Sequence, residues 1–267
     1  RYREVKSQDG LQYQLVFNIT PFYPEGGGQV GDTGVIQSSN EKITILNTRR
    51  ENKLIIHLTD NLPKEIASNF VAKVNTVNRK ASARNHTATH LLHESLRTIL
   101  GNHVVQKGSL VNPTYLRFDF THFSKIEESD LQKIEKDVNS KILANIALNE
   151  HVNLPLDKAQ GLGAIMLFGE KYEDIVRMIQ FNTSKELCGG THVNATGEIG
   201  IFKILSEGSI SSGIRRIEAK TGDSALDYLN DKELLLNEIG DLVKNKDLKS
   251  GVEKLVNYNK QLERELA

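Results

Sequence analysis

Short runs of alternating apolar and polar residues fill the N-terminal quarter of the chain. "LQYQLVFNIT" and "KITILNTRR" follow the two-residue period of half-buried strands, and "KLIIHLT" is a short apolar run. Ser38 to Asn40 and the pair Asp60-Asn61 are typical turn sequences between these runs. Several short strands at this spacing predict a small β-barrel or a β-sandwich over residues 1–76.

A helical pattern begins near Asn78. "RKASARNHTATHLLHESLRTILGN" is rich in helix formers, and Gly101 supplies a stop signal at its end. "HVVQKGSLV" and "YLRFDFTH" then predict two strands. Ser124 and Glu127 have the spacing of a capping box, which predicts a second helix that runs to about Asn149.

Further strands and then helices complete the chain. "GIFKILSEGSI" and "GIRRIEAKTG" predict two more strands, so the middle of the chain is predicted to be α+β. From Asp223 onward, apolar residues at helical spacing form a stripe that consists of Leu226, Leu229, Leu234, Ile239, Leu242, Leu255, Leu262 and Leu266. We therefore predict three parts: a β-barrel subdomain over 1–76, an α+β core over 77–222, and a helical segment over 223–267.

The composition indicates a folded, globular protein. Of the 267 residues, 38% are hydrophobic and 25% are charged. A single cysteine cannot form an internal disulfide, so a cytoplasmic location is the default expectation. No apolar run approaches the ~20 residues of a membrane helix, and we expect no membrane partner. Because the formal net charge is zero, nucleic-acid binding would depend on a local basic patch.

Two histidines mark the predicted helix as a candidate metal site. His86 and His90 are four residues apart, so both imidazoles leave the same helix face one turn apart. This spacing suits two ligands of one metal ion, although two histidines with ordinary hydrogen bonds are the simpler alternative. His93 lies one turn further on, and we interpret it as a packed histidine rather than as another ligand.

The only cysteine lies in "ELCGGTHV". Cys188 and His192 are four residues apart, and the two glycines between them allow the backbone to fold back tightly. Together with His86 and His90 they offer one sulfur and three nitrogens, a set that suits tetrahedral Zn²⁺. A buried core cysteine and a Cys–His nucleophilic pair are the alternatives, and no third group that would orient such a pair is visible.

Two other features could contact a substrate or a nucleic acid. "TPFYPEGGGQVGDTG" contains three consecutive glycines that permit close approach to a ligand, although a plain hairpin turn is the simpler interpretation. Arginines near the histidine helix and in "SGIRRIEAK" suit phosphate groups if they line a cleft, the alternative being a solvated charged face. The candidates for these contacts are Gly26, Gly27, Gly28, Gln29, Arg84, Arg215 and Arg216.

Taken together, these segments closely resemble the editing domain of the alanyl-tRNA synthetase family. The resemblance lies in "FYPEGGGQVGDTG", "NHTATHLLHESLR", "VVQKGSLV", "LRFDFTH", "ELCGGTHV" and "TGEIGIFKILSEGSISSGIRRIEAKTG", which occur in the family's order. It covers about residues 10–222. The paired HxxxH and CxxxH also occur in threonyl-tRNA synthetases, whereas the triple glycine and "SGIRRIEA" are of the alanyl type.

This resemblance implies both a fold and an activity. The implied fold is a small β-barrel subdomain packed on an α/β core of the second-additional-domain type, followed by helices that begin an oligomerisation region. One zinc ion per chain would be held by His86, His90, Cys188 and His192. Thr89 and Gln106 would face the aminoacyl group. The implied partner is the tRNA(Ala) acceptor end with a wrong amino acid, and the implied activity is hydrolysis of Ser-tRNA(Ala) and Gly-tRNA(Ala).

Three alternatives remain open at this point. The chain could be a free-standing protein that deacylates tRNA in trans, although its start at Arg1 and its end at Ala267 within a helical pattern favour a piece of a longer synthetase. It could be a zinc-stabilised RNA-binding module without activity, or a thiol hydrolase that uses Cys188. Residues 223–267 hold ten acidic and seven basic side chains, so we expect this segment to bind phosphates poorly. We expect the chain to be a monomer or a weak dimer, with any pairing made through residues 250–267.

Overall fold

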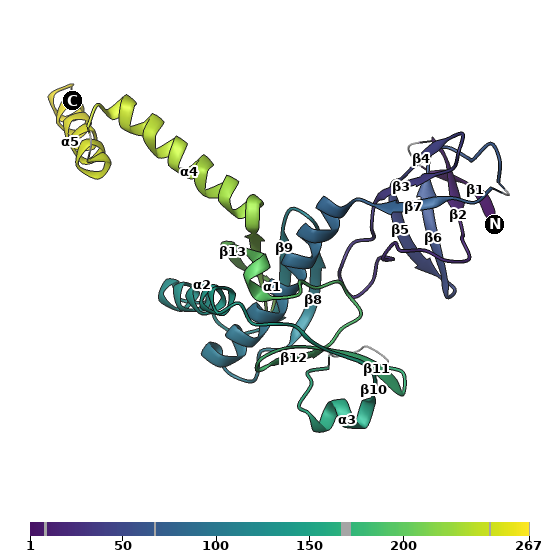
Figure 1. Ribbon diagram of the computed structural model, residues 1–267. Coiled ribbons are helices and arrows are strands. Elements are labelled where there is room, and N and C mark those ends of the chain that lie inside the picture. The colour runs from purple at the N-terminus through teal and green to yellow at the C-terminus, as the bar shows by residue number, and fades with distance from the viewer. Residues whose placement is uncertain (8–9, 67, 167–171, 246, 267) are drawn as a thin grey trace. The chain divides into compact units, whose positions relative to one another are not determined.

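The computed structural model describes residues 1–267 except 8–9, 67, 167–171, 246 and 267. The chain forms two compact units, Arg1–Gly222 and Asp223–Ala267. The first unit is a mixture of sheets and helices, and the second is helical (Figure 1).

The N-terminal strands form two separate antiparallel sheets. One has the order β1 (Tyr2–Ser7), β2 (Gly10–Leu15), β6 (Leu54–Thr59), β5 (Asn47–Glu51), and the other has the order β4 (Lys42–Ile45), β3 (Gly34–Gln37), β7 (Val71–Val74). Their shared core contains Leu15, Phe22, Ile36, Ile43 and Ile45. A closed barrel needs a continuous ladder of strand pairs. The described strands leave both sheets open, so the barrel prediction is not confirmed.

The histidine helix, α1 (Thr76–Leu100), begins close to the residue that the sequence indicates. The side chain of Asn75 caps it by accepting a hydrogen bond from the Asn78 backbone N–H at 3.1 Å. Gly101 ends the helix with φ +115°, a conformation that L side chains rarely adopt. The predicted helix and its glycine stop are confirmed.

A four-stranded antiparallel sheet supports this helix. Its order is β13 (Phe202–Ser211), β14 (Ile214–Thr221), β9 (Leu116–Thr121), β8 (Gln106–Val111). All four strands lie where the sequence predicts strands. Phe118 and Phe120 on β9 are buried in one core with Leu91, Leu92 and Leu96 on α1. The apolar face of α1 is therefore packed against the sheet, which sets the direction in which its histidines point.

The predicted capping box is wrong. Helix α2 spans Glu128–Leu143, and its N-cap is Glu127 without a side-chain cap. The Ser124 hydroxyl lies 3.3 Å from His122 Nε2 instead, so it contributes nothing to the helix start. The helix also ends before Asn149, because Asn145 adopts a left-handed conformation with φ +46°.

The stretch between α2 and the cysteine forms a smaller sheet. It has the order β10 (Asn149–Pro155), β11 (Ile175–Phe181), β12 (Ser184–Leu187), and helix α3 (Leu156–Gly161) packs on it. A 3-10 turn, η1 (Thr196–Ile199), follows. Since β12 ends at Leu187, Cys188 is the first residue after this sheet.

The second unit consists of α4 (Gly222–Val243) and α5 (Leu248–Leu266), as the apolar stripe predicts. Only Ala225 and Gly251 are buried among its described residues. Several apolar side chains of this unit are exposed, namely Leu226, Leu234, Leu235, Leu236, Leu242, Val252, Leu255, Val256, Tyr258 and Leu266. None of the helices in the described ranges combines the length and apolar character that a membrane crossing requires.

Candidate metal centre

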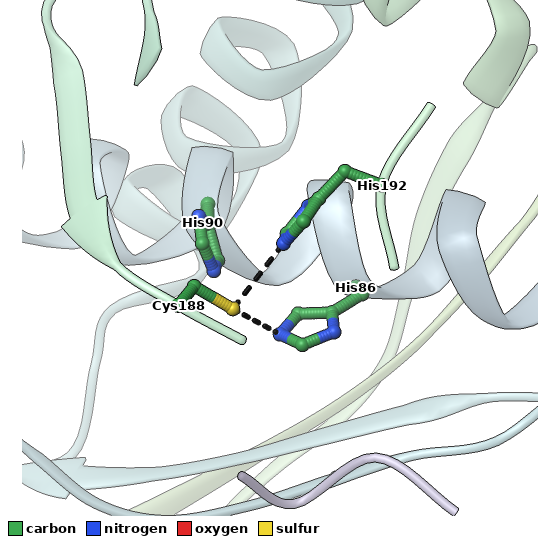
Figure 2. A group of neighbouring side chains, drawn as sticks. All are labelled: His86, His90, Cys188 and His192. Atoms are coloured by element: carbon green, nitrogen blue, oxygen red, sulfur yellow. Dashed lines mark hydrogen bonds between the residues drawn. The ribbon is translucent and has the colours of Figure 1, made fainter. Parts of the chain in front are cut away.

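Four side chains from two distant segments meet beside helix α1. His86 and His90 leave one face of α1, and Cys188 and His192 follow β12 (Figure 2). One ligand atom from each of the four lies within 4.8 Å of all the others. Cys188 Sγ is 3.3 Å from His86 Nε2 and 3.3 Å from His192 Nε2. The predicted set of one sulfur and three nitrogens is thus brought together by the fold.

His86 and His192 each have a polar partner beside Nδ1. His86 Nδ1 donates to Gln29 Oε1 at 2.7 Å, and His192 Nδ1 lies 3.1 Å from Thr87 Oγ1. Histidines that bind metals usually have such a partner on the nitrogen away from the ion, because it sets the tautomer and the ring orientation. Because Gln29 Oε1 can only accept, the proton of His86 is on Nδ1 and its lone pair is on Nε2, the atom that faces Cys188.

The two nitrogens of His90 have different surroundings. Its Nε2 lies 3.4 Å from Glu186 Oε2, while its Nδ1 is buried and has no hydrogen-bond partner among the described residues. A buried polar atom without a partner is costly unless something binds it. The donor set and the unpaired nitrogen both fit Zn²⁺.

Burial keeps the three histidines neutral. It is the main cause that lowers the pKa values of His86 and His192 well below 6.5, and the neighbouring imidazoles and Arg177 lower them further. The pKa of His90 is also lowered, chiefly by burial, although Glu186 opposes the shift. Neutral imidazoles are the form that binds a metal, so these residues are ready to act as ligands at neutral pH.

The turn from Cys188 to His192 is tightly packed. Arg177 donates to the carbonyl oxygens of Cys188 and Gly190 at 2.9 and 2.7 Å, which fixes the path of the backbone. A Cβ atom at Gly190 would overlap the His86 ring and lie 2.9 Å from Gln29 Oε1, whereas a Cβ at Gly189 would have no neighbour within 4 Å. The need for glycine here arises from close packing at one position, not from an unusual backbone angle at either.

The glycine-rich segment forms a hairpin turn beside this centre. The backbones of Gly26 and Gln29 exchange hydrogen bonds of 3.1 and 3.0 Å, and Gly27 and Gly28 have positive φ angles of 56° and 79°. Gln29 itself is fully buried. Its side chain bonds to His86 and Thr191, with Nε2 2.9 Å from Thr191 Oγ1 and Oε1 2.9 Å from the Thr191 backbone nitrogen. The predicted ligand-contacting glutamine is thus engaged with the histidine helix and the cysteine turn.

The three predicted phosphate-binding arginines have partners within the protein. Arg84 lies within α1 and donates to the Glu198 carbonyl oxygen at 3.0 Å. On β14, Arg215 pairs with Glu207 at 2.8 Å, and Arg216 pairs with Asp119 through two hydrogen bonds of 2.7 and 2.8 Å. These bonds engage Nε of Arg84 and both sides of the Arg215 and Arg216 guanidinium groups. A role of the three arginines in tRNA binding stays a prediction.

The two predicted substrate-binding residues lie on helix α1 and strand β8. Thr89 is on α1 between His86 and His90, is buried, and donates its hydroxyl hydrogen to the Asn85 carbonyl oxygen at 2.8 Å. Gln106 is the first residue of β8, is half-buried, and stands opposite Phe120 of β9. Their contact with an aminoacyl group stays a prediction.

Glu186 is a buried residue of the site that the sequence interpretation missed. Its Oε1 lies 2.9 Å from His93 Nδ1, and its other oxygen faces His90. Burial alone would raise the pKa of Glu186, but His90 and His93 outweigh it and lower that pKa. Its position in the sequence could have indicated this role. Glu186 precedes Cys188 by two residues, and residues two apart in an extended segment point to the same side. His93 is a packed, buried histidine, as the sequence predicts.

The fold and the site define a class of protein, and two family models match the chain. Residues 2–79 match the model described as tRNA synthetases class II (A). Residues 176–218, which include Cys188 and His192, match the model described as threonyl and alanyl tRNA synthetase second additional domain. The chain is thus built from parts of class II aminoacyl-tRNA synthetases.

Alanine–tRNA ligases are similar to the chain over its whole length. It is 51% identical to the enzyme of Cytophaga hutchinsonii and 50% identical to that of Flavobacterium psychrophilum, in both cases over 100% of the chain and 31% of the relative. It is 53% identical to the enzyme of Bacteroides fragilis over 91% of the chain and 29% of that relative. The chain belongs to the alanine–tRNA ligase family, and it spans less than a third of these relatives.

Proposed function

We propose that this part of an alanine–tRNA ligase hydrolyses the ester bond of Ser-tRNA(Ala) and Gly-tRNA(Ala). The observation that carries this proposal is the cluster of His86, His90, Cys188 and His192, half of which lies in the segment that matches the second additional domain. Its partner would be the acceptor end of tRNA(Ala) with a wrong amino acid. A reducing, cytoplasmic setting would suit a centre that contains the single cysteine.

A second, hydrolytic site has a clear physical purpose in such an enzyme. A pocket for alanine discriminates weakly against one extra hydroxyl or one missing methyl, because each difference is worth only about 1–3 kcal/mol. A later hydrolytic step can remove the errors if it accepts serine and spares alanine. Polar groups that bond only to the serine hydroxyl would achieve this, since alanine would leave them buried and unpaired at about 1–3 kcal/mol.

Thr89 is suited to this discrimination. Because its hydrogen is donated to the Asn85 carbonyl oxygen, its oxygen is free to accept a hydrogen bond from a substrate hydroxyl. Gln106 offers both an amide donor and a carbonyl acceptor to the same aminoacyl group. Hydrolysis replaces the ester C–O bond with a bond to a water oxygen, and the proton of that water ends on the ribose hydroxyl. The residues of this chain would orient the ester and the water for that exchange.

The four candidate ligands fit Zn²⁺, and their number limits the chemistry that a bound zinc ion could supply. A tetrahedral ion with four protein ligands has no open position, so zinc would supply structural order and a local positive charge. His86, His90 and His192 would hold it as neutral imidazoles, with Cys188 as the thiolate. In the full-length enzyme, the exposed apolar stripe of α4 and α5 would serve oligomerisation.

One experiment tests the proposal and separates it from the alternatives. Protein purified without chelator is assayed for zinc and incubated with radiolabelled Ser-tRNA(Ala), Gly-tRNA(Ala) and Ala-tRNA(Ala). We expect about one zinc per chain, release of serine and glycine, and retention of alanine. Zinc without hydrolysis would support an RNA-binding module. Hydrolysis that survives chelation but is lost when the metal-loaded protein is alkylated would support a thiol hydrolase.

A further inference from the structure

A cavity of about 470 Å³ opens beside the glycine turn. Its volume is within the range of small-molecule sites and is sufficient for part of a nucleotide. The turn, the end of β5 and the middle of β8 enclose it, and the lining residues are Glu25, Gly26, Gly28, Val30, Arg49, Arg50, Ser109 and Leu110. None of them belongs to the four-residue ligand cluster.

Two adjacent arginines determine the charge of this cavity. Arg49 Nε lies 3.1 Å from Glu51 Oε1, so part of its charge is compensated. Arg50 is exposed and has no ion pair among the described residues. Among the described residues that line the cavity, Glu25 is the one with a carboxylate. Unlike Arg84, Arg215 and Arg216, Arg50 is therefore available to a ligand.

The walls of the cavity suit a phosphate group. The guanidinium of an arginine can donate two parallel hydrogen bonds to phosphate oxygens. Ser109 adds a hydroxyl, and Gly26 and Gly28 leave backbone without side chains at the wall. A side chain at position 28 would clash with β8, because its Cβ would lie 2.7 Å from the Ser109 carbonyl oxygen. Glycine at position 28 thus allows the turn to pack directly against β8.

The cavity lies close to the candidate metal centre. The Tyr23 hydroxyl donates to the Gly26 carbonyl oxygen at 2.8 Å, which ties this ring to the cavity wall. The pKa of Tyr23 is raised to about 12 by burial and by Cys188, and Arg50 acts in the opposite direction. Next to the cavity wall, Gln29 contacts His86 directly.

We propose that this cavity binds a phosphodiester group of the single-stranded 3′ end of tRNA through Arg50, with Ser109 and the glycine turn as its walls. The proposal rests on the proposed function, because it names the position at which that substrate is held. In this arrangement, Arg50 binds a phosphate that precedes the terminal nucleotide while the ester reaches the metal centre. Phosphate contacts of this kind fix position and do not read sequence.

The test uses unacylated tRNA(Ala) and the same tRNA without its last three nucleotides. Binding of each to the zinc-loaded protein is measured by fluorescence anisotropy at several salt concentrations, for the unchanged protein, Arg50→Gln and Lys42→Gln. Lys42 is an exposed cation of β4 and does not line the cavity, so it is a matched control for the loss of one charge. Zinc content and circular dichroism verify that each variant is folded.

We expect Arg50→Gln to weaken binding of the complete tRNA about tenfold, as for one charge-assisted hydrogen bond. The slope of log affinity against log salt should decrease by about 0.7. Binding of the shortened tRNA should change no more than in Lys42→Gln. An equal loss with both RNAs, or no loss with either, would overturn the proposal. Because no hydrolysis is measured, this result is independent of whether the protein deacylates Ser-tRNA(Ala).

Discussion

Gln29 Oε1 and His86 Nδ1 are joined by a hydrogen bond of 2.7 Å that links the N-terminal glycine turn to the candidate metal centre. The same oxygen accepts a bond from the Thr191 backbone nitrogen at 2.9 Å, within the turn between Cys188 and His192. One buried glutamine therefore holds three segments together. By accepting from Nδ1–H, it leaves the lone pair of His86 on Nε2, the atom that faces Cys188.

Replacing Gln29 should weaken metal binding without unfolding the protein. We expect Gln29→Leu to lower zinc affinity about 10- to 100-fold, because His86 loses the acceptor that sets its tautomer. Gln29→Glu retains an acceptor and should bind zinc nearly as well as the unchanged protein. Competition with a chromophoric chelator measures the affinity. Gln14→Leu, which removes another buried glutamine from the N-terminal sheets, is the control and should keep full affinity.

The two glycines of the cysteine turn should respond differently to alanine. Gly190→Ala places a methyl group against the His86 ring, so we expect poor zinc loading and a loss of stability of about 1–3 kcal/mol. Gly189→Ala meets no atom within 4 Å and should be nearly neutral. Zinc analysis and thermal unfolding of both variants provide the comparison. Equal behaviour of the two would contradict the packing described here.

The metal-free protein should become less stable as the pH falls. The folded-state pKa values of His86, His90 and His192 lie below the unfolded value near 6.5, so the unfolded chain binds more protons in this range. Stability should be highest above about pH 7 and should decrease as the pH is lowered through 6.5. Thermal unfolding of chelator-treated protein at pH 7.5 and 5.5 measures this. A higher midpoint at pH 5.5 would show that the shifts have the opposite sign.

Variants of Thr89 and Gln106 test the substrate pocket. Thr89→Val exchanges a hydroxyl for a methyl of similar size, and we expect a roughly 10- to 100-fold loss of Ser-tRNA(Ala) hydrolysis from one lost hydrogen bond. A bulky residue at Gln106 should also impair hydrolysis by filling the space for the aminoacyl group. Thr98→Val is the control, because Thr98 makes a similar bond to a helix carbonyl, at 2.9 Å to Glu94, but is exposed. Unchanged rates for both pocket variants would exclude these residues from the pocket.

Deleting residues 250–267 tests the role of the C-terminal helices. The described part of α5 has only Gly251 buried and exposes Leu255, Val256 and Tyr258. We expect the unchanged chain to be a monomer or a weak dimer, and the deletion to abolish any dimer seen by light scattering. Zinc content and deacylation should be unaffected. If the deletion instead destroys hydrolysis, α5 is part of the active site.

The local elements and the kinds of candidate metal ligand could be predicted from the residue pattern alone. Spacing within one element follows from backbone geometry, so the position of His86 and His90 on one helix face needed no further information. The same holds for the glycine that ends α1 and for the strands of the β13–β14–β9–β8 sheet. The pairing of His86 with Cys188, 102 residues apart, was indicated by their chemistry and by a family resemblance, not by local pattern.

The partners of the polar side chains, in contrast, depend on how the elements pack against one another. Nothing in the pattern around Arg216 indicates that Asp119 on the neighbouring strand forms an ion pair with it. Nor does the pattern indicate that Arg50 lines a cavity and has no ion pair with any residue that the structure describes. Likewise, Gln29 resembled a ligand contact in a glycine loop until the fold placed its side chain against His86. Hydrogen bonds and ion pairs between distant segments depend on how sheets and helices pack. The local sequence pattern does not show which distant residues this packing brings into contact.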